Sequence, residues 1–159
     1  VRAVAEGADV TVAASLADAV EGQQLVALTT LWNAAQREVI SGLGDRLVGT
    51  VLLDVSNPLD VTPRGIIPAH AAEGSAGQFV ATLLPEGTGH VKAFANLATA
   101  FIEESAQQGA VLPFAADSAA TAAIVRPYFV RTGWQPWLVG DLSASRELEI
   151  GGRYNAVHG

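Results

Sequence analysis

The chain has 159 residues, of which half are apolar and 16% are charged, and its formal net charge is −7 at pH 7. This length predicts one domain over residues 1–159 with its own core. The excess of acidic residues argues against a general nucleic-acid binder, which needs a basic face. The lack of cysteine excludes disulfides, thiol catalysis and cysteine-bound metal. No apolar run approaches the roughly 18 residues of a transmembrane helix. We expect a cytoplasmic protein that contacts neither nucleic acid nor membrane.

Methionine is absent from the whole chain, including the first position. A natural open reading frame begins with methionine, so we expect a segment to precede Val1. The predicted domain is then incomplete at its N-terminus.

Short apolar runs bounded by glycine, proline or polar residues predict strands, and the amphipathic stretches between them predict helices. Before residue 60 we expect a helix that ends at Gly7, a strand over residues 10–13, a helix over 15–20, a strand over 24–30, a helix over 31–43 and a strand over 51–56. A loop over 61–69 leads to a helix over 72–84, a strand over 90–94 and a helix over 97–108. The last expected elements are a strand over 111–115, a helix over 117–132, a strand over 135–139 and the start of a helix capped by Ser143. Strands that alternate with helices predict right-handed crossovers. The expected fold class is therefore α/β, a doubly wound parallel sheet with helices on both faces.

Several helix ends contain residues suited to capping. Ser15 can cap the helix that follows it, with Asp18 three residues on. Asp117 can cap the helix over 117–132, and Gly133 lies just past its end. Pro127 lies inside this helix and should kink or interrupt it.

Residues 51–56 (VLLDVS) are the strand around which we expect the sheet to be organised. A run of branched aliphatic residues too short for a helix is typical of a central parallel strand buried on both faces. Asn57-Pro58 ends the strand because proline cannot donate to a ladder. Ligands bind at the carboxyl ends of parallel strands, so Asn57 is either a ligand-binding amide or part of a simple turn. Pro136 predicts an edge strand over 135–139.

No group of side chains suited to acid–base, nucleophilic or metal chemistry stands out. His70, His90 and His158 have no ligand spacing between them, and we expect each on the surface or at a cap. We therefore predict no catalytic residue and no metal ligand. Hydride transfer between two organic cofactors suits such a chain, since it depends on orientation and exclusion of water more than on protein side chains.

Four sequence blocks resemble one family, the NADP-dependent reductases of the deazaflavin coenzyme F-420, which have a Rossmann fold. The blocks are VALTTLW at 26–32, VLLDVSNPLD at 51–60, a helix at 74–84 followed by VKAF at 91–94, and Gly133-Trp134 followed by GDL at 140–142 with Arg146 and Glu149. Their order and spacing cover nearly the whole chain. Leu31 stands where the family usually has proline, and Ala95-Asn96 replaces the asparagine that normally follows Phe94.

The resemblance implies an NADP-dependent oxidoreductase that passes a hydride between NADPH and F-420 or a similar small acceptor. NADP is then the cofactor, and F-420 is a candidate second one. The resemblance also implies a homodimer, with Trp134, Trp137 and Tyr154 as apolar anchors between subunits. The alternative is a truncated Rossmann domain that serves as a non-catalytic binding or interaction module.

The family's first strand, its G-x-G-x-x-G turn with the following helix, and its second strand have no counterpart in this sequence. In that fold the pyrophosphate rests on this turn and on the helix N-terminus. We therefore expect the 159-residue chain to bind NADPH weakly or not at all, and a version that carries the upstream segment to bind it well.

The resemblance also assigns site residues by position. The implied cofactor-binding residues are Thr29, Thr30, Leu31, Trp32, Asn57, Pro58, Leu59, Lys92, Phe94 and Asn96, and the implied acceptor residues are Gly140, Asp141 and Leu142. A structural alternative exists for the segment after the strand at 24–30, where the threonines can cap a helix and the tryptophan can belong to the core.

Lys92 is the only lysine and lies within an apolar strand, where an unpaired charge is costly. Its side chain must either reach the end of the strand or pair with a carboxylate or a phosphate. Arg146 and Glu149 are three residues apart on the last predicted helix, and we expect them to pair with each other.

Overall fold

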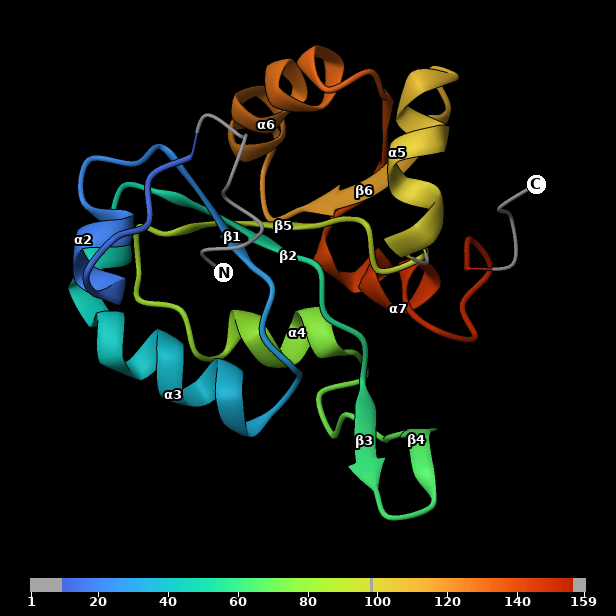
Figure 1. Ribbon diagram of the computed structural model, residues 1–159, viewed down its shortest axis with the longest axis horizontal. Helices are drawn as coiled ribbons and strands as arrows, with labels where there is room; N and C mark the ends of the chain where they lie inside the picture. The colour runs from blue at the N-terminus through green and yellow to red at the C-terminus, as the bar shows by residue number, and fades with distance from the viewer. Residues whose placement is uncertain (1–9, 98, 156–159) are drawn as a thin grey trace.

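Five strands form one sheet in the computed structural model of the protein, which describes residues 10–97 and 99–155 (Figure 1). In the order β1-β2-β5-β6-β7 across the sheet, the strands are β1 (Leu25–Leu28), β2 (Val51–Asp54), β5 (Gly89–Lys92), β6 (Val111–Ala116) and β7 (Gln135–Gly140). β1, β2 and β5 run parallel to one another. β6 runs antiparallel to β5, and β7 runs parallel to β6. The sheet is thus mostly parallel, with one reversal that the alternation of strands and helices does not reveal.

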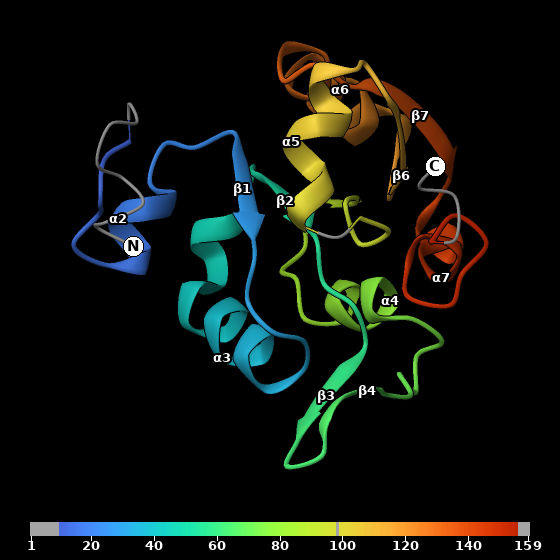
Figure 2. The ribbon, with the colours of Figure 1, turned by 45° about the vertical axis from the view of Figure 1, so that its right-hand side comes forward.

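Helices cover both faces of the sheet (Figures 1 and 2). They are α2 (Leu16–Val20), α3 (Ala34–Leu43), α4 (Ala76–Ala81), α5 (Thr99–Gln107), α6 (Ala119–Arg131) and α7 (Ser145–Leu148), with short 3-10 helices η1 (Gly44–Leu47) and η2 (Leu142–Ala144). α3 and α4 lie on one face, and α5 and α6 lie on the other. The predicted doubly wound α/β fold is confirmed.

β2 is buried along its whole length, as its aliphatic sequence predicted. Val51 and Leu53 point toward α6 and join a core that also contains Phe129. Leu52 points the opposite way and joins a second core with Ile40 of α3 and residues of α4. Successive side chains of a strand point to opposite faces, so this one strand contributes to both cores.

A two-stranded antiparallel hairpin projects from the body of the domain (Figures 1 and 2). Its strands are β3 (Leu59–Thr62) and β4 (Gly65–Pro68). The prediction of a loop over residues 61–69 is therefore wrong. Pro63, Gly65 and Pro68 argued against a strand, but Pro63 lies in the turn and Gly65 takes the φ of 116° that closes it.

The strand predicted over residues 10–13 does not form. This segment has no regular structure, and Val10 and Val12 are exposed. β-branched residues favour a strand chiefly through packing against a neighbouring strand, and none of the described strands pairs with this segment. The helix predicted to end at Gly7 lies outside the described residues.

The ends of the helices depart from prediction in detail. Ser15 caps α2 as predicted. α6, however, is capped by Ser118 and not by Asp117, whose carboxylate accepts the backbone N–H of His90 at 2.7 Å. Pro127 does not interrupt α6. It is exposed, so water can replace the backbone hydrogen bond that proline removes.

β7 lies at one edge of the sheet, as Pro136 predicted, and β1 lies at the other. Within the described part of the chain, no helix is both long enough and apolar enough to cross a membrane.

Candidate functional site

The carboxyl ends of β1, β2 and β5 meet at one edge of the sheet. Leu28 pairs with Asp54 and Asp54 pairs with Lys92, so the three strands end level with one another. Residues 29–32 and 55–59 then leave the sheet beside each other, along with the segment that follows β5. Most of the cofactor-binding residues predicted from the sequence come together at this edge, where ligands bind in open α/β sheets.

Lys92 is fully buried at the end of β5. Its Nζ lies 2.9 Å from Asp54 Oδ2 and 3.4 Å from Glu149 Oε1, and it also donates to the carbonyl oxygen of Ser56. Of the two alternatives from the sequence, pairing with carboxylates is the one that forms. The ammonium connects β2 and β5 to the chain after α7 from within the protein. We call Asp54, Ser56, His90, Lys92 and Glu149 the buried charge cluster.

Asp54 is held in its ionised form by this cluster. Burial by itself raises the pKa of the carboxyl, but the Lys92 ammonium, His90 and Ser56 outweigh burial and hold the pKa of Asp54 below its usual range. The carboxylate Oδ1 also accepts the backbone N–H of Ser56 at 2.9 Å and lies 3.4 Å from the Gln36 amide nitrogen. Asp54 is therefore fixed in place by several neighbouring elements.

The low pKa of Asp54 predicts an acid-sensitive fold. A carboxyl whose pKa is lower in the folded state than in the unfolded state stabilises the folded state at pH values above the unfolded pKa, which is about 4 for aspartate. This stabilisation is lost as the pH falls toward the folded-state pKa. We expect the free energy of unfolding to decrease steadily below about pH 4, with a shallower decrease in an Asp54→Asn variant. Urea unfolding from neutral to acid pH measures the free energy of unfolding of the parent chain and of the Asp54→Asn variant. Asp60→Asn, at an exposed residue of the hairpin, is the control. Parallel curves for the Asp54→Asn variant and the parent chain would contradict the assignment.

Glu149 is fully buried and binds the first turn of α4. Its two oxygens accept the backbone N–H groups of Ala76 at 3.0 Å and Gly77 at 2.9 Å. These donors have no partner within the helix, and a carboxylate near a helix N-terminus is favourable. The predicted pair between Arg146 and Glu149 is wrong, since Arg146 donates to the carbonyl of Ile150 at 3.0 Å.

His90 is buried, so the prediction of a surface or capping histidine is wrong for this residue. Its Nε2 lies 3.7 Å from Asp54 Oδ2, and neither ring nitrogen has a hydrogen-bond partner in the part of the chain that is described. Its place on β5, two residues before Lys92, puts both side chains on the same face of the strand. His70 is exposed as expected, and His158 lies outside the described residues.

The side chain of Asn57 is bound by backbone at both ends. Its Nδ2 donates to the carbonyl of Ala95 at 2.8 Å, and its Oδ1 accepts the N–H of Ile150 at 2.7 Å. Asn57 thus connects the segments after β2, β5 and α7. Pro58 is buried beside it, and Leu59 begins the hairpin.

The segment after β1 combines exposed and unpaired groups. Thr29 and Leu31 are exposed, while Thr30 and Trp32 are half-buried. Thr30 Oγ1 and Trp32 Nε1 are buried atoms that find no hydrogen-bond partner among the described residues. The Trp32 ring packs edge-on against Phe79 of α4 at 5.7 Å between centroids. Buried polar atoms are usually paired, so two unpaired ones in three residues mark this segment as a candidate ligand contact.

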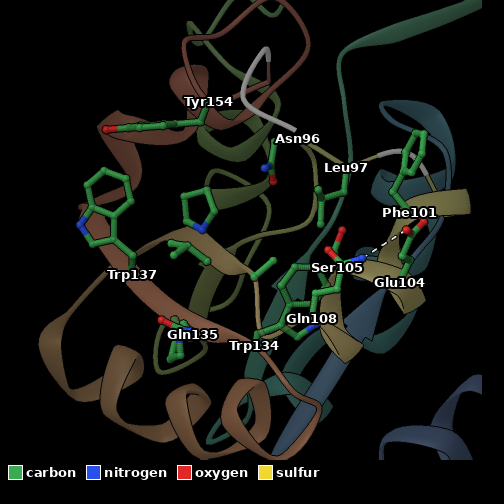
Figure 3. Close-up of a pocket in the computed structure, with 14 residues that line it drawn as sticks. Asn96, Leu97, Phe101, Glu104, Ser105, Gln108, Trp134, Gln135, Trp137 and Tyr154 are labelled. Atoms are coloured by element: carbon green, nitrogen blue, oxygen red, sulfur yellow. Dashed lines mark hydrogen bonds between the residues drawn. The ribbon is translucent and has the colours of Figure 1, made fainter. Parts of the chain in front are cut away.

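The residues after β5 divide between the core and a cavity. Phe94 has a φ of 62°, which bulky side chains rarely adopt, and its ring packs against Phe129 and Trp134 at 5.7 Å each. Asn96 is buried and lines a large cavity between α5, β6 and β7 (Figure 3). No other predicted cofactor-binding residue lines that cavity.

The implied acceptor residues follow β7. Gly140 pairs with Ala115, which pairs with Lys92, so Gly140 lies level with the end of β5 but two strands away. Asp141 caps η2 by accepting from the backbone N–H and the hydroxyl of Ser143, and these hydrogen bonds lower the pKa of Asp141. Ser143, the predicted cap of the last helix, is thus a donor within η2. Leu142 is the first residue of η2.

The edge formed by β1, β2 and β5 holds a hydroxyl and an indole N–H without described partners beside apolar groups. The charged groups beneath it are buried and paired. Such a surface can orient a planar, uncharged ring. Within the described residues no group of three or more metal-ligating side chains could hold an ion. The chemistry that the edge supports is positioning and shielding from water.

Comparisons with known proteins identify the fold. The sequence matches no protein-family model, and no curated protein matches it. A hypothetical protein from Sinorhizobium meliloti has a similar structure, with a TM-score of 0.74 and 23% identity over 86% of this chain and 66% of that one. A provisionally assigned F-420-dependent NADP reductase from Arthrobacter has a TM-score of 0.71 and 22% identity, over 86% of this chain and 64% of that one.

A more distant structure is that of a reductive aminase from Aspergillus terreus in complex with NADPH and ethyl levulinate. It has a TM-score of 0.53 and 18% identity over 83% of this chain and 40% of that one. These likenesses show a Rossmann-like fold. The chain spans about two thirds of the length of the Arthrobacter and Sinorhizobium proteins.

Proposed function

We propose that this protein is an NADP-dependent oxidoreductase that passes a hydride between NADPH and a small planar acceptor of the deazaflavin type. The observation that carries the proposal is the pair of unpaired buried atoms, Thr30 Oγ1 and Trp32 Nε1, in the segment that follows β1. The sequence resemblance assigns the same segment to the nicotinamide half of NADP. The Arthrobacter reductase and the NADPH-bound aminase, which share the fold, support this choice of cofactor.

The described residues fit the nicotinamide end of the cofactor better than its phosphates. A hydroxyl and an indole N–H can pair with the carboxamide and ribose of the nicotinamide half. Lys92, the cation at the end of β5, is fully buried and already paired with two carboxylates. The sequence contains no G-x-G-x-x-G turn to hold a pyrophosphate.

Each group at this edge contributes by binding or positioning. Bound NADPH supplies the hydride itself, so the protein needs to hold two rings in register and exclude water. Asn57 fixes the chain after β2 to the segments that follow β5 and α7, and Pro58 closes that part of the edge with apolar surface. Beneath them the buried charge cluster keeps the ends of β2 and β5 level.

The proposal predicts weak binding of NADPH to the 159-residue chain, with a dissociation constant well above the low micromolar range. Charge-assisted hydrogen bonds contribute roughly 1.5–3 kcal/mol each, and the 159-residue sequence lacks the G-x-G-x-x-G turn that supplies them to the pyrophosphate. Calorimetric titration measures the constant. Thr30→Val, which keeps the shape of the side chain, should weaken the remaining binding about tenfold, whereas the exposed Thr11→Val should not.

Two outcomes would contradict this assignment. A dissociation constant in the low micromolar range would mean that the phosphates are bound elsewhere on the chain. Equal binding by the Thr30→Val and Thr11→Val variants would mean that the nicotinamide does not contact the segment after β1.

A non-catalytic binding module is the second candidate function. The lack of a G-x-G-x-x-G turn in the 159-residue sequence favours it, since a smaller ligand without a pyrophosphate needs no such turn. An assay of NADPH oxidation with added F-420 or flavin distinguishes an enzyme from a binding module. The loss of NADPH absorbance measures the oxidation. Acceptor-dependent oxidation identifies an enzyme, and ligand binding without oxidation identifies a module.

We also propose that the protein is a cytoplasmic homodimer. Trp134 cannot serve as an anchor between subunits, because it is 4% exposed and packs against Phe94. Val61, Ile66 and Ile67 on the projecting hairpin are exposed and provide another apolar surface. Sedimentation at high micromolar concentration should show a dimer, and a Val61→Asp/Ile66→Asp variant should shift the equilibrium toward monomer. Monomer alone at that concentration would count against the proposal.

A further inference from the structure

A cavity of about 920 Å³ lies between α5 and the neighbouring strands β6 and β7 (Figure 3). Its volume is within the range of about 300–1,000 Å³ that is typical of sites for small molecules. The edge at β1 and β2 is separate from it, since neither strand nor the segments after them contribute to its lining. Of the residues that the sequence resemblance assigns to the cofactor, Asn96 alone lines the cavity, so the cavity is not the position proposed for the nicotinamide.

Aromatic rings form one side of the cavity. Trp137 on β7 packs edge-on against Tyr154, with 5.3 Å between ring centroids, and 49% of Trp137 is exposed. Trp134 lies deeper and is buried. Leu97 and Phe101 approach from the side of α5, as Figure 3 shows. Facing aromatic and aliphatic walls favour a flat apolar molecule between them.

Asn96 supplies a buried polar contact of the cavity. It is 4% exposed, and its Oδ1 has no hydrogen-bond partner among the described residues. Figure 3 shows its amide directed into the space between Tyr154 and Leu97. An asparagine amide both donates and accepts, so its natural complement is another amide or a ring lactam.

The charge of the lining sets a further condition on the ligand. Among the described residues of the lining, Glu104 is the one charged side chain, and its Oε1 accepts from Gln108 Nε2 at 3.2 Å. None of these described lining residues is a lysine, an arginine or a histidine. An anionic group would lose water there and meet a like charge, which is unfavourable. Phosphorylated ligands such as NADP therefore do not suit this cavity.

We propose that this cavity is a second binding site, which takes a planar aromatic molecule with an amide or lactam edge and no anionic group on its ring. The ring lies against Trp137 and Tyr154, and its amide edge pairs with Asn96. This site differs from the position proposed for the nicotinamide, and it can be tested without NADPH.

The test uses 2-naphthamide and 2-naphthoate, which share a ring system and differ in having an amide or a carboxylate. Titration into the 159-residue chain, followed by tryptophan fluorescence and calorimetry, should show saturable binding of the amide. The carboxylate should bind at least about tenfold more weakly, a difference of about 1.4 kcal/mol. Equal or tighter binding of the carboxylate, or no saturable binding of the amide, would overturn the proposal.

Two variants locate the binding. Asn96→Leu replaces a buried amide whose Oδ1 has no described partner by an apolar group of similar size, so the fold should persist. Trp137→Ala removes a half-exposed ring. Each should weaken binding of 2-naphthamide about tenfold or more. Val130→Ala, at an exposed residue of α6 outside the cavity, is the control and should bind as the parent chain does. If either Asn96→Leu or Trp137→Ala binds within about twofold of the control, the amide is bound elsewhere and the proposal fails.

Discussion

A Lys92→Met variant is expected to lose about 3–5 kcal/mol of its free energy of unfolding at neutral pH, the usual effect of breaking a buried ion pair. Methionine fills a similar volume but leaves Asp54 and Glu149 buried without their shared cation. It also removes the donor to the Ser56 carbonyl. A single domain of this size has a total stability of only about 5–15 kcal/mol, so the variant should be close to unfolding. Urea denaturation followed by circular dichroism measures the loss.

The matched control is Arg131→Met, which removes a cation from the exposed side of α6 and should change stability by less than about 0.5 kcal/mol. The deficit of Lys92→Met should shrink at acid pH, because protonation of Asp54 removes the charge that lost its partner. A pH-independent loss would show that packing of the lysine stem matters more than its charge. A loss below about 1 kcal/mol would contradict the role given to Lys92.

Gly77→Ala is the second substitution with a large expected effect. A Cβ at Gly77 would lie 2.5 Å from Ser145 Oγ and 2.7 Å from Ser145 Cβ, too close for any pair of such atoms. α4 and α7 must then move apart, which disturbs the hydrogen bond from the Gly77 N–H to Glu149. We expect a loss of about 1–3 kcal/mol, as for other overpacked sites, measured as the shift of the urea midpoint.

Gly42→Ala provides the contrast. Gly42 also lies in a helix, but nothing is within 4 Å of the added Cβ. The substitution should therefore stabilise the protein by up to about 1 kcal/mol, the difference in helix propensity. A Gly77→Ala/Ser145→Gly double variant should recover much of the loss, since Ser145 supplies both close atoms. If the two glycine variants were equally stable, α4 and α7 would not approach as closely as the structure indicates.

The sequence predicted most of the fold because its signals are local. The aliphatic run at 51–56 identifies β2, which contributes to both cores, and Pro136 correctly places β7 at an edge. The hairpin at 59–68 was missed because the same prolines and glycine are typical of a loop. Local signals could not predict the reversal of β6, since a helix between two strands is compatible with either direction.

The candidate site was predicted in part. The resemblance named residues in the segments after β1, β2 and β5, and the pairing of these strands brings the three segments to one edge of the sheet. The three-residue spacing of Arg146 and Glu149 predicted that these two residues pair. Glu149 instead follows the end of α7, and its carboxylate binds the first turn of α4 and Lys92, which are distant in the sequence. Burial of Lys92 and His90 follows from the pairing of β5 with strands on both sides, which no single segment reveals.

β1 has a strand partner on one side only, among the described residues, and its four residues include neither proline nor a charged group. Alternate amides along Leu25–Leu28 can therefore exchange with deuterium in water without any unfolding, whereas those of β2 wait for the sheet to open. The side of β1 that has no described partner also offers a row of donors and acceptors to which a further strand can add. A lysine introduced at Ala27, which is exposed on this strand, should weaken any such addition to the 159-residue chain, and sedimentation of the variant and the parent chain at high concentration measures the difference.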